Sequence, residues 1–337
     1  MSSICKKCSN GLIYEPESQN LVCKHCGNVE MIERNYDYSR RVFSMDGYIS
    51  EEKVPKVNMS VSIKCATCGA INNGEKSTLH DCIYCGAKLR NTYTKVGANN
   101  VDGCLPFVVS EHNVRNLFKE QLKKKKFLPN DFKKLPDNAE IHGLYYMAYK
   151  FNIDINASYK GDIVEDVDGE TVKRRIVGNK YFTKRDIVIE GSSYMSQDDF
   201  ESLQPYDYSS VVKFDERFIA GFDIEASNKT LTDVRSIARN KSISSIRSEI
   251  SKDYEGNTLE NLNIKYNFMN CDYSKLILPV YKITYNYGNK KYMSFINGQT
   301  GKLAGKLPKS GLKIFLAIAG VLLAVGGVIG IILNAIK

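Results

Sequence analysis

Four C-x-x-C pairs occupy the first 85 residues of this 337-residue chain. They form two quartets: Cys5, Cys8, Cys23 and Cys26, then Cys65, Cys68, Cys82 and Cys85. Fourteen residues separate the two pairs of the first quartet, and thirteen separate those of the second. A C-x-x-C turn aims two sulfurs at one ion, and a hairpin of this length returns the second turn to complete a tetrahedron. The spacing therefore predicts two zinc ribbons, each with four thiolate ligands.

Glycine follows the second cysteine of three pairs, as Gly27, Gly69 and Gly86, and supplies the permissive backbone that such a turn needs. A disulfide framework or a redox C-x-x-C are the competing interpretations, but four regular pairs exceed what a redox motif needs. His25 or His80 could replace a thiolate. A closed four-sulfur shell leaves no open position for substrate, so we expect two structural Zn²⁺ ions.

The remaining cysteines, Cys104 and Cys271, have no C-x-x-C partner, and we expect them to be ordinary buried thiols.

Residues 314–333 (IFLAIAGVLLAVGGVIGIIL) carry no charged or strongly polar side chain. At about 1.5 Å per residue, such a helix spans roughly 30 Å, the thickness of a bilayer core. We therefore predict one transmembrane helix over 312–335. Four lysines precede it and could face lipid headgroups: Lys302, Lys306, Lys309 and Lys313. By the positive-inside rule, this places the bulk of the chain in the cytoplasm, with a single pass through the cell membrane.

Gly326 and Gly330 form a GxxxG pair inside this segment. Such a pair lets a second membrane helix approach closely and would support a homo-oligomer. Glycine is also common in membrane helices generally, so both interpretations stay open.

The net charge of +9 has a local origin. Nine lysines and no acidic residue follow Asp272, so residues 1–272 are formally neutral. A nucleic-acid-binding domain usually carries its basic excess on the contacting domain itself. This distribution favours a membrane surface over nucleic acid as the partner of the basic segment.

By composition and motif pattern, the chain divides into ribbon 1 (1–34), a linker (35–64), ribbon 2 (65–95), a core (104–308) and the membrane segment (312–335). In the core, helical spacing predicts a helix opening at Ser110 and another over 230–254, with Thr230 and Asp233 at capping-box spacing. LPFVV (105–109) and several alternating runs predict strands. Turns at Asp168-Gly169 and Gly178-Asn179 predict hairpins. We predict an α+β fold with mostly antiparallel strands.

No catalytic motif is present. The sequence contains no G-x-x-x-x-G-K-[ST], H-E-x-x-H, G-x-S-x-G or G-x-G-x-x-G, and its four scattered histidines offer little for a triad. We therefore expect a protein that is not an enzyme and has no catalytic residues.

The order of parts resembles a known family. Two ribbons precede LPFVVSEHNVRNLFKEQLKKKKFLPNDFK, IHGLYYMAYKFNIDINASYKGD, LQPYDYSSVVKFDERFIAGF and LPVYKITYNYGNKKYMSFINGQTGKLAGKLPKSGLK. This arrangement is similar to bacterial membrane-anchored proteins with transcription-factor-IIB-type zinc ribbons, often labelled primosomal protein N′ or helicase-like. The resemblance implies association with SPFH (flotillin-like) and phage-shock-protein-A-like membrane-stress partners. The sequence lacks Trp, which relatives often place where Tyr145–Phe151 and Val280-Tyr281 stand here.

We therefore expect a non-enzymatic, membrane-anchored zinc-ribbon adaptor that recruits or scaffolds cytoplasmic proteins at the bacterial inner membrane. The alternative is a membrane-tethered nucleic-acid-binding protein that uses its ribbons.

Overall fold

The computed structural model describes residues 4–46, 60–64, 71–75, 101–132, 139–167, 170–192, 195–225, 227, 229–254 and 258–335. Side chains are described for these residues except 60–64, 71–75, Val167 and most of the chain after Leu322. Its fold is α+β with a mostly antiparallel sheet, as predicted.

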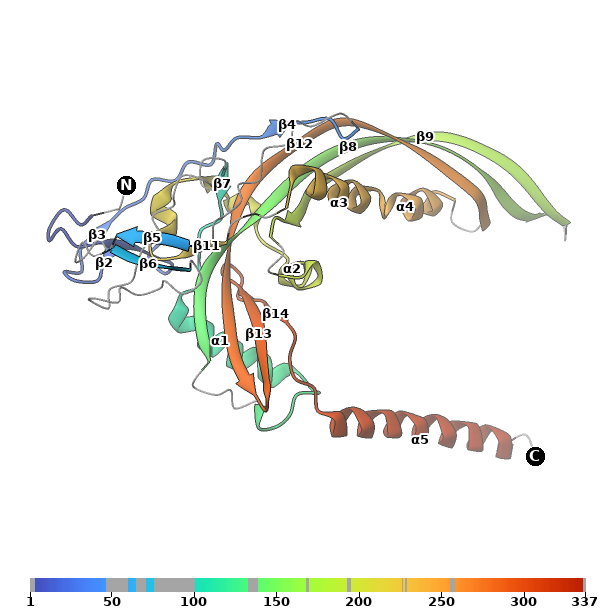
Figure 1. Cartoon of the computed structure of the whole chain (residues 1–337). Helices are drawn as coiled ribbons and strands as arrows, with labels where there is room; N and C mark the ends of the chain where they lie inside the picture. The colour runs from blue at the N-terminus through green and yellow to red at the C-terminus, as the bar shows by residue number, and fades with distance from the viewer. Residues whose placement is uncertain are drawn as a thin grey trace.

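Three long strands form the frame of the molecule: β8 (Glu140–Val167), β9 (Glu170–Glu190) and β12 (Thr258–Tyr287). β8 lies between the other two and is antiparallel to both. The strands bend into an arch (Figure 1). Register shifts interrupt the pairing at Glu260/Asn263, Phe268/Cys271 and Phe151/Ile153, and β-bulges of this kind bend and twist strands.

Shorter strands extend the same nine-stranded sheet: β4 (Arg41–Val42), β7 (Gly103–Cys104), β10 (Val212–Lys213), β11 (Asp223–Glu225), β13 (Lys290–Asn297) and β14 (Leu303–Gly305). Two pairings are parallel, β7 with β12 and β11 with β8. The strand predicted over LPFVV (105–109) is not formed, because the strand in this region is β7, which ends at Cys104. Leu105 and Phe107 are nonetheless fully buried.

Helices cover the sheet as α1 (Glu111–Lys124), α2 (Gln197–Leu203), α3 (Leu231–Ile243) and α4 (Ile246–Lys252), with 3-10 turns η3 (Tyr208–Ser210) and η4 (Glu216–Ile219). α3 and α4 lie under the arch, and Val234, Ile246 and Ile250 bury their side chains against it (Figure 1). The predicted capping box is present, with the Thr230 hydroxyl accepting from the Asp233 backbone. The single helix predicted over 230–254 is two helices, α3 and α4, separated by a turn at Ser244 and Ser245.

The hairpin predicted at Asp168-Gly169 is confirmed by the pairing of Val167 with Glu170. The one predicted at Gly178-Asn179 is wrong, since both residues lie inside β9. A Cβ at Gly178 would stand 2.5 Å from the ring of Tyr159 on the neighbouring strand. Glycine at this position leaves space for the Tyr159 ring and does not form a turn.

Residues 35–46, the first part of the predicted linker, run beside β12 and contact the core. Arg41 and Val42 pair with β12, and Phe43 packs edge-on against Phe151 at 5.6 Å. Met45 is buried in the cluster under α3 and α4. This segment fastens the N-terminal region to the arch.

The N-terminal region itself forms a three-stranded sheet of β1 (Leu12–Glu15), β2 (Asn20–Cys23) and β3 (Val29–Glu30). A separate hairpin pairs β5 (Ser60–Lys64) with β6 (Ile71–Glu75).

At the other end, α5 (Gly311–Ala335) extends away from the sheet (Figure 1). Its described large apolar side chains are exposed: Leu312, Phe315, Leu316, Ile318, Val321, Leu322 and Val325. Over the described part of the chain, no helix is both long and apolar enough to cross a membrane. The transmembrane helix predicted over 312–335 is therefore not found among the described residues, where the structure has the helix α5 with its described large apolar side chains exposed.

Candidate metal centre

Two turns with the same backbone hydrogen bonds carry the four cysteines of ribbon 1. The Cys5 amide donates to the Asn10 carbonyl at 2.7 Å, and the Ser9 amide donates back to the Cys5 carbonyl at 2.9 Å. The second turn repeats both bonds, from Cys23 to Asn28 and from Gly27 to Cys23. Each turn therefore presents two thiols from a fixed backbone.

Both turns need a left-handed residue directly after the second cysteine. Gly27 has φ +69°, and Ser9 stands at the equivalent position with φ +58°. Glycine adopts this conformation freely, whereas a residue with a Cβ does so at a cost. The predicted role of Gly27 is confirmed, and Ser9 carries out the same turn without glycine.

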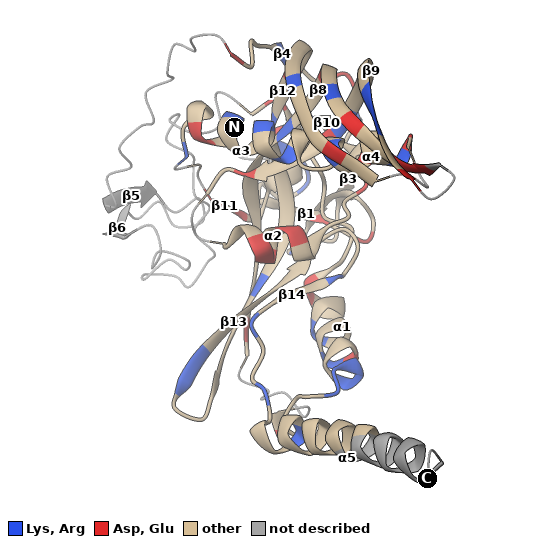
Figure 2. Ribbon diagram, turned by 90° about the vertical axis from the view of Figure 1, so that its right-hand side faces the viewer, with Lys and Arg blue, Asp and Glu red and all other residues tan. Residues whose placement is uncertain are grey.

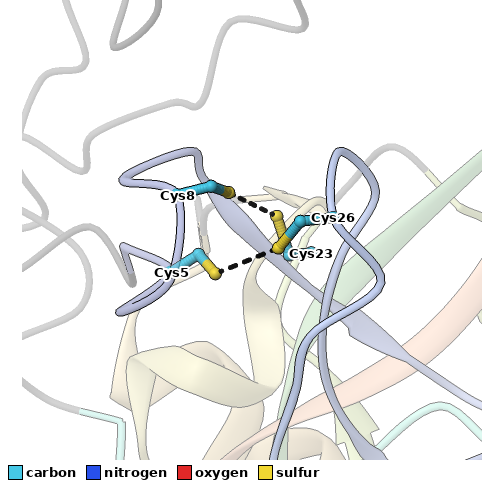
Figure 3. A group of neighbouring side chains, drawn as sticks. All are labelled: Cys5, Cys8, Cys23 and Cys26. Carbon is cyan, nitrogen blue, oxygen red and sulfur yellow. Dashed lines mark hydrogen bonds between the residues drawn. The ribbon is translucent and has the colours of Figure 1, made fainter.

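The four sulfurs gather at one point (Figure 3). The Sγ atoms of Cys5 and Cys26 lie 3.6 Å apart, those of Cys8 and Cys23 lie 3.4 Å apart, and all four lie within 4.8 Å of one another. A tetrahedron with Zn–S bonds of about 2.3 Å has edges of about 3.8 Å. The first predicted quartet is therefore a four-cysteine cluster that could bind a metal such as zinc.

The surroundings favour thiolate at part of the cluster. A backbone hydrogen bond at Asn10 lowers the pKa of the Cys8 thiol to about 6. Cys5 and Cys23 are buried, whereas Cys26 is exposed. His25 lies on the exposed side of its turn and is not part of the cluster.

The second quartet, Cys65, Cys68, Cys82 and Cys85, lies outside the described residues, as does His80. The strands that flank Cys65 and Cys68 are described, and their register repeats that of ribbon 1. Lys64, directly before Cys65, pairs with Ile71, three residues after Cys68. In ribbon 1, Ile4 pairs with Gly11 at the same two positions, again antiparallel.

Ribbon 1 is built into the core. The Tyr14 amide donates to the Ala220 carbonyl at 2.8 Å, and its ring packs edge-on against Phe218 at 5.7 Å. Cys5, Cys23 and Tyr14 belong to the same buried cluster as Phe107 and Tyr281. The predicted division at residue 34 does not anticipate this contact, although the alternation of Leu12 with Tyr14 and of Leu21 with Cys23 is a signal for a buried face.

Glu17 also joins ribbon 1 to α1. Its carboxylate accepts from the Ser110 hydroxyl at 2.7 Å and from the Asn113 side chain at 3.1 Å. Ser110 is the N-cap of α1, so the negative charge lies at the end of the helix where the macrodipole favours it.

The four lysines predicted to face lipid differ in their contacts. Lys313 Nζ donates to the Leu128 carbonyl at 2.7 Å and to Asn130 Oδ1 at 2.6 Å, and Lys302 Nζ donates to the Gln204 carbonyl. Lys306 and Lys309 are exposed. Lys302 is exposed as well, and lipid contact by the four lysines stays a prediction.

Cys104 and Cys271 are buried free thiols, as predicted. Burial raises the pKa of both, that of Cys271 to about 11. The side-chain surroundings of Gly326 and Gly330 in α5 lie outside the description, so their packing role stays a prediction.

Comparison with known proteins gives one distant relative. The chain is 26% identical over 228 residues to the uncharacterized protein YdjG of Bacillus subtilis (strain 168), a match that covers 64% of this chain and 67% of YdjG. No family model matches the chain. No solved structure matches it either.

Proposed function

We propose that this chain is a non-enzymatic adaptor, anchored to the bacterial inner membrane through α5 and stabilised by two structural zinc ions. It recruits or scaffolds cytoplasmic proteins at that membrane. The observation that carries the proposal is the apolar surface of α5, whose described large side chains are 53% to 69% exposed.

An apolar helix of this kind is costly in water, at about 25 cal/mol for each Å² of apolar surface. Contiguous exposed apolar patches mark sites that another apolar phase covers. The sequence continues without a charge from Ile314 to Leu333, which suits the acyl chains of a bilayer. On this basis we retain a single-pass anchor, with the rest of the chain cytoplasmic, as the favoured topology.

The matching registers support a second zinc site. Lys64 with Ile71 and Ile4 with Gly11 enclose their C-x-x-C pairs in the same way, and the second quartet has nearly the spacing of the first. We therefore propose that Cys65, Cys68, Cys82 and Cys85 bind a second Zn²⁺. Four thiolates close the coordination shell in each ribbon, which suits a structural role.

The resemblance noted above suggests the class of protein partner. That resemblance implies association with SPFH-type and phage-shock-protein-A-like proteins, and we propose partners of these two kinds. A homo-oligomer through Gly326 and Gly330 is a further arrangement that the same experiment can detect.

Membrane fractionation tests the anchor. The tagged full chain is expressed in a bacterial host, and its membranes are washed with carbonate. We expect the protein to stay with the membrane, and Phe315→Lys, Ile318→Lys and Leu322→Lys together to release it. A matched variant with Phe315→Leu, Ile318→Leu and Leu322→Ile is expected to stay bound. Release of the unmodified chain by the wash would overturn an integral anchor.

Crosslinking in the same membranes tests the adaptor role. Specific cytoplasmic proteins, or a second copy of the chain, are expected to co-purify with the conservative variant and to be lost with the lysine variant. Recovery of the same proteins with both variants would mean that α5 does not direct recruitment.

The exposed lysines beside the cysteine cluster favour one alternative, a nucleic-acid-binding protein. Lys6, Lys7 and Lys24 all lie exposed on the two turns that hold the sulfurs. Binding through them would weaken steeply with salt, because each neutralised phosphate releases counterions. Salt-dependent binding of the purified chain to DNA or RNA, lost on changing these lysines to glutamate, would favour this function over the adaptor. Nucleotide turnover would instead indicate an enzyme.

A further inference from the structure

The end of the sheet next to α5 carries exposed lysines from three separate parts of the chain. We call this surface the basic end, and its members are Lys123, Lys124, Lys125, Lys126, Lys290, Lys291, Lys306 and Lys309. Figure 2 shows the groups on α1 and on the β12–β13 hairpin on the same end of the molecule as the start of α5.

Hydrogen bonds from the loop after α1 hold the start of α5 in place. The Ser310 amide donates to the Phe127 carbonyl at 2.8 Å, one residue beyond the four lysines. Lys313 donates to Leu128 and Asn130 in the same loop. The lysines at the end of α1 therefore lie beside the first turn of α5.

The same loop also contacts the tip of the β12–β13 hairpin. The Tyr287 hydroxyl donates to both carboxylate oxygens of Asp131 at 2.9 Å, and Phe132 packs edge-on against the Tyr287 ring at 5.1 Å. Lys290 and Lys291 follow directly on the hairpin. Three basic segments are thus fixed around one loop and are not independent tails.

Charge on this end is largely uncompensated among the described residues. No ion pair there involves any lysine of the basic end, whereas lysines and arginines of β9 pair with carboxylates: Lys173 with Glu260, Arg174 with Glu165, Arg175 with Asp162, Lys180 with Asp253, Lys184 with Glu249 and Arg185 with Asp154. Asp131, the carboxylate of the central loop, is engaged by Tyr287. Among the described residues, this surface therefore carries an excess of positive charge.

We propose that the basic end binds the anionic headgroups of the bilayer that α5 enters. This inference rests on the proposed membrane anchor and identifies the lipid class that it selects. Phe127, 46% exposed beside Lys126, and Leu312 and Phe315 on the first turns of α5 place apolar groups next to the lysines. Apolar side chains beside lysines suit the boundary between headgroups and acyl chains.

The basic end keeps Lys306 and Lys309 of the four lysines that the sequence suggested, and adds the lysines of α1 and of the hairpin. Lys302 and Lys313 instead donate to backbone carbonyls of the chain. A lysine near an anionic membrane strengthens binding about five-fold.

Vesicle binding of the full-length protein tests the inference. The probes are phosphatidylcholine vesicles with and without phosphatidylserine, at low and high salt. The test variant combines Lys124→Glu, Lys125→Glu and Lys126→Glu. The matched control makes the same charge change at exposed lysines on β10, α4 and the arch: Lys213→Glu, Lys252→Glu and Lys265→Glu.

We expect phosphatidylserine to strengthen binding of the unmodified protein. The affinity of the test variant for the phosphatidylserine vesicles should be lower than that of the unmodified protein by on the order of 100-fold. The control variant is expected to keep the strengthening by phosphatidylserine, and high salt to reduce it. Equal loss, or no loss, in both variants overturns the inference. Weak binding of every form to both vesicles instead indicates failure of the anchor itself. Loss of RNA or DNA binding in the test variant, with lipid binding unchanged, would assign the basic end to nucleic acid.

Discussion

The hydroxyl of Tyr14 donates a hydrogen bond to the carbonyl oxygen of Phe107 at 3.2 Å, and so joins ribbon 1 directly to the core. The Gln19 side chain donates to the same oxygen at 2.6 Å. Because Tyr14 lies on β1, between the two cysteine turns, whatever orders the turns also orders this contact. Metal binding at the four sulfurs is therefore expected to stabilise the sheet beyond the ribbon.

Metal removal tests that coupling. Structural zinc supplies on the order of 10 kcal/mol of folding free energy in small zinc peptides, so Cys26→Ser should lower the free energy of unfolding by several kcal/mol. Hydrogen exchange at the backbone amides of residues 103–105 and 107–109 should rise in this variant and on chelation. Cys26→His, which keeps a ligand for zinc, is expected to restore much of the protection. Unchanged exchange in the serine variant would mean that the core folds without the metal.

The Tyr14 contact itself has a separable contribution. Tyr14→Phe removes the hydroxyl while Gln19 still satisfies the Phe107 carbonyl, so we expect a loss of about 1 kcal/mol. Tyr14→Ala also removes the buried ring and should cost about 3–5 kcal/mol. Tyr36→Phe provides the control because Tyr36 is 55% exposed, and denaturant unfolding should show no change. A comparable loss in the Tyr36 variant would argue against a specific contact.

Substitutions at the two left-handed residues of the cysteine turns, Ser9 and Gly27, should change the free energy of unfolding in opposite directions. Ser9→Gly relieves the cost of φ +58°, whereas Gly27→Ala imposes that cost at φ +69°. With zinc bound, we expect the first change to raise the free energy of unfolding or leave it unchanged, and the second to lower it by about 1–2 kcal/mol. Thermal unfolding of the zinc-loaded chain measures both. A gain from Gly27→Ala would contradict the left-handed assignment, since no atom blocks a Cβ there.

The sequence was sufficient where the signal is local. α1 begins directly after Ser110, as predicted, although the Ser110 hydroxyl makes no cap hydrogen bond. Thr230 and Asp233 form the predicted capping box, because such a box depends on residues within one turn. The first cysteine quartet likewise gathers as its spacing predicts. These features need no knowledge of distant contacts.

Long-range contacts account for what the sequence did not predict. Gly178 has the form of a turn residue, but its role depends on Tyr159 from the neighbouring strand. Residues 35–46 show no sustained periodicity and therefore suggest a linker. Their contacts with β12 and Phe151 depend on residues more than 100 positions away in the sequence. The basic end brings the end of α1 together with two segments that lie more than 150 residues later in the chain.

Gly178 offers a test of this difference. Gly178→Ala would place a methyl 2.5 Å from the Tyr159 ring, and overpacking of this kind costs about 1–3 kcal/mol. In a turn, the same substitution would act through backbone strain and would not depend on Tyr159. We therefore expect Tyr159→Leu to reduce the cost of Gly178→Ala in a double-mutant cycle. Additive free energies of unfolding would contradict the close approach.

Glu190 gives the fold a pH dependence that a mutation can isolate. Its carboxylate is fully buried at the end of β9, and Lys229 Nζ lies 3.3 Å from Oε2. Burial raises the pKa of Glu190 to about 7, although Lys229 opposes the change. Between about pH 4.5 and 7 the unfolded chain releases this proton while the folded chain keeps it. The contribution to stability is therefore complete at the acidic end of this range and is lost as the pH rises through 7.

Glu190→Gln removes the titration of the carboxyl and keeps the Lys229 side chain. The free energy of unfolding of the unmodified protein, relative to this variant, should fall by about 3 kcal/mol as the pH rises from 4.5 to 8, since a tenfold change in proton affinity is worth about 1.4 kcal/mol. Glu201→Gln is the matched control, because Lys241 lowers the pKa of Glu201 and confines its titration to more acidic conditions. Denaturant unfolding across the range measures both differences. A flat Glu190 difference would mean that the Lys229 ammonium keeps the buried carboxylate ionised, with the pair closed at neutral pH.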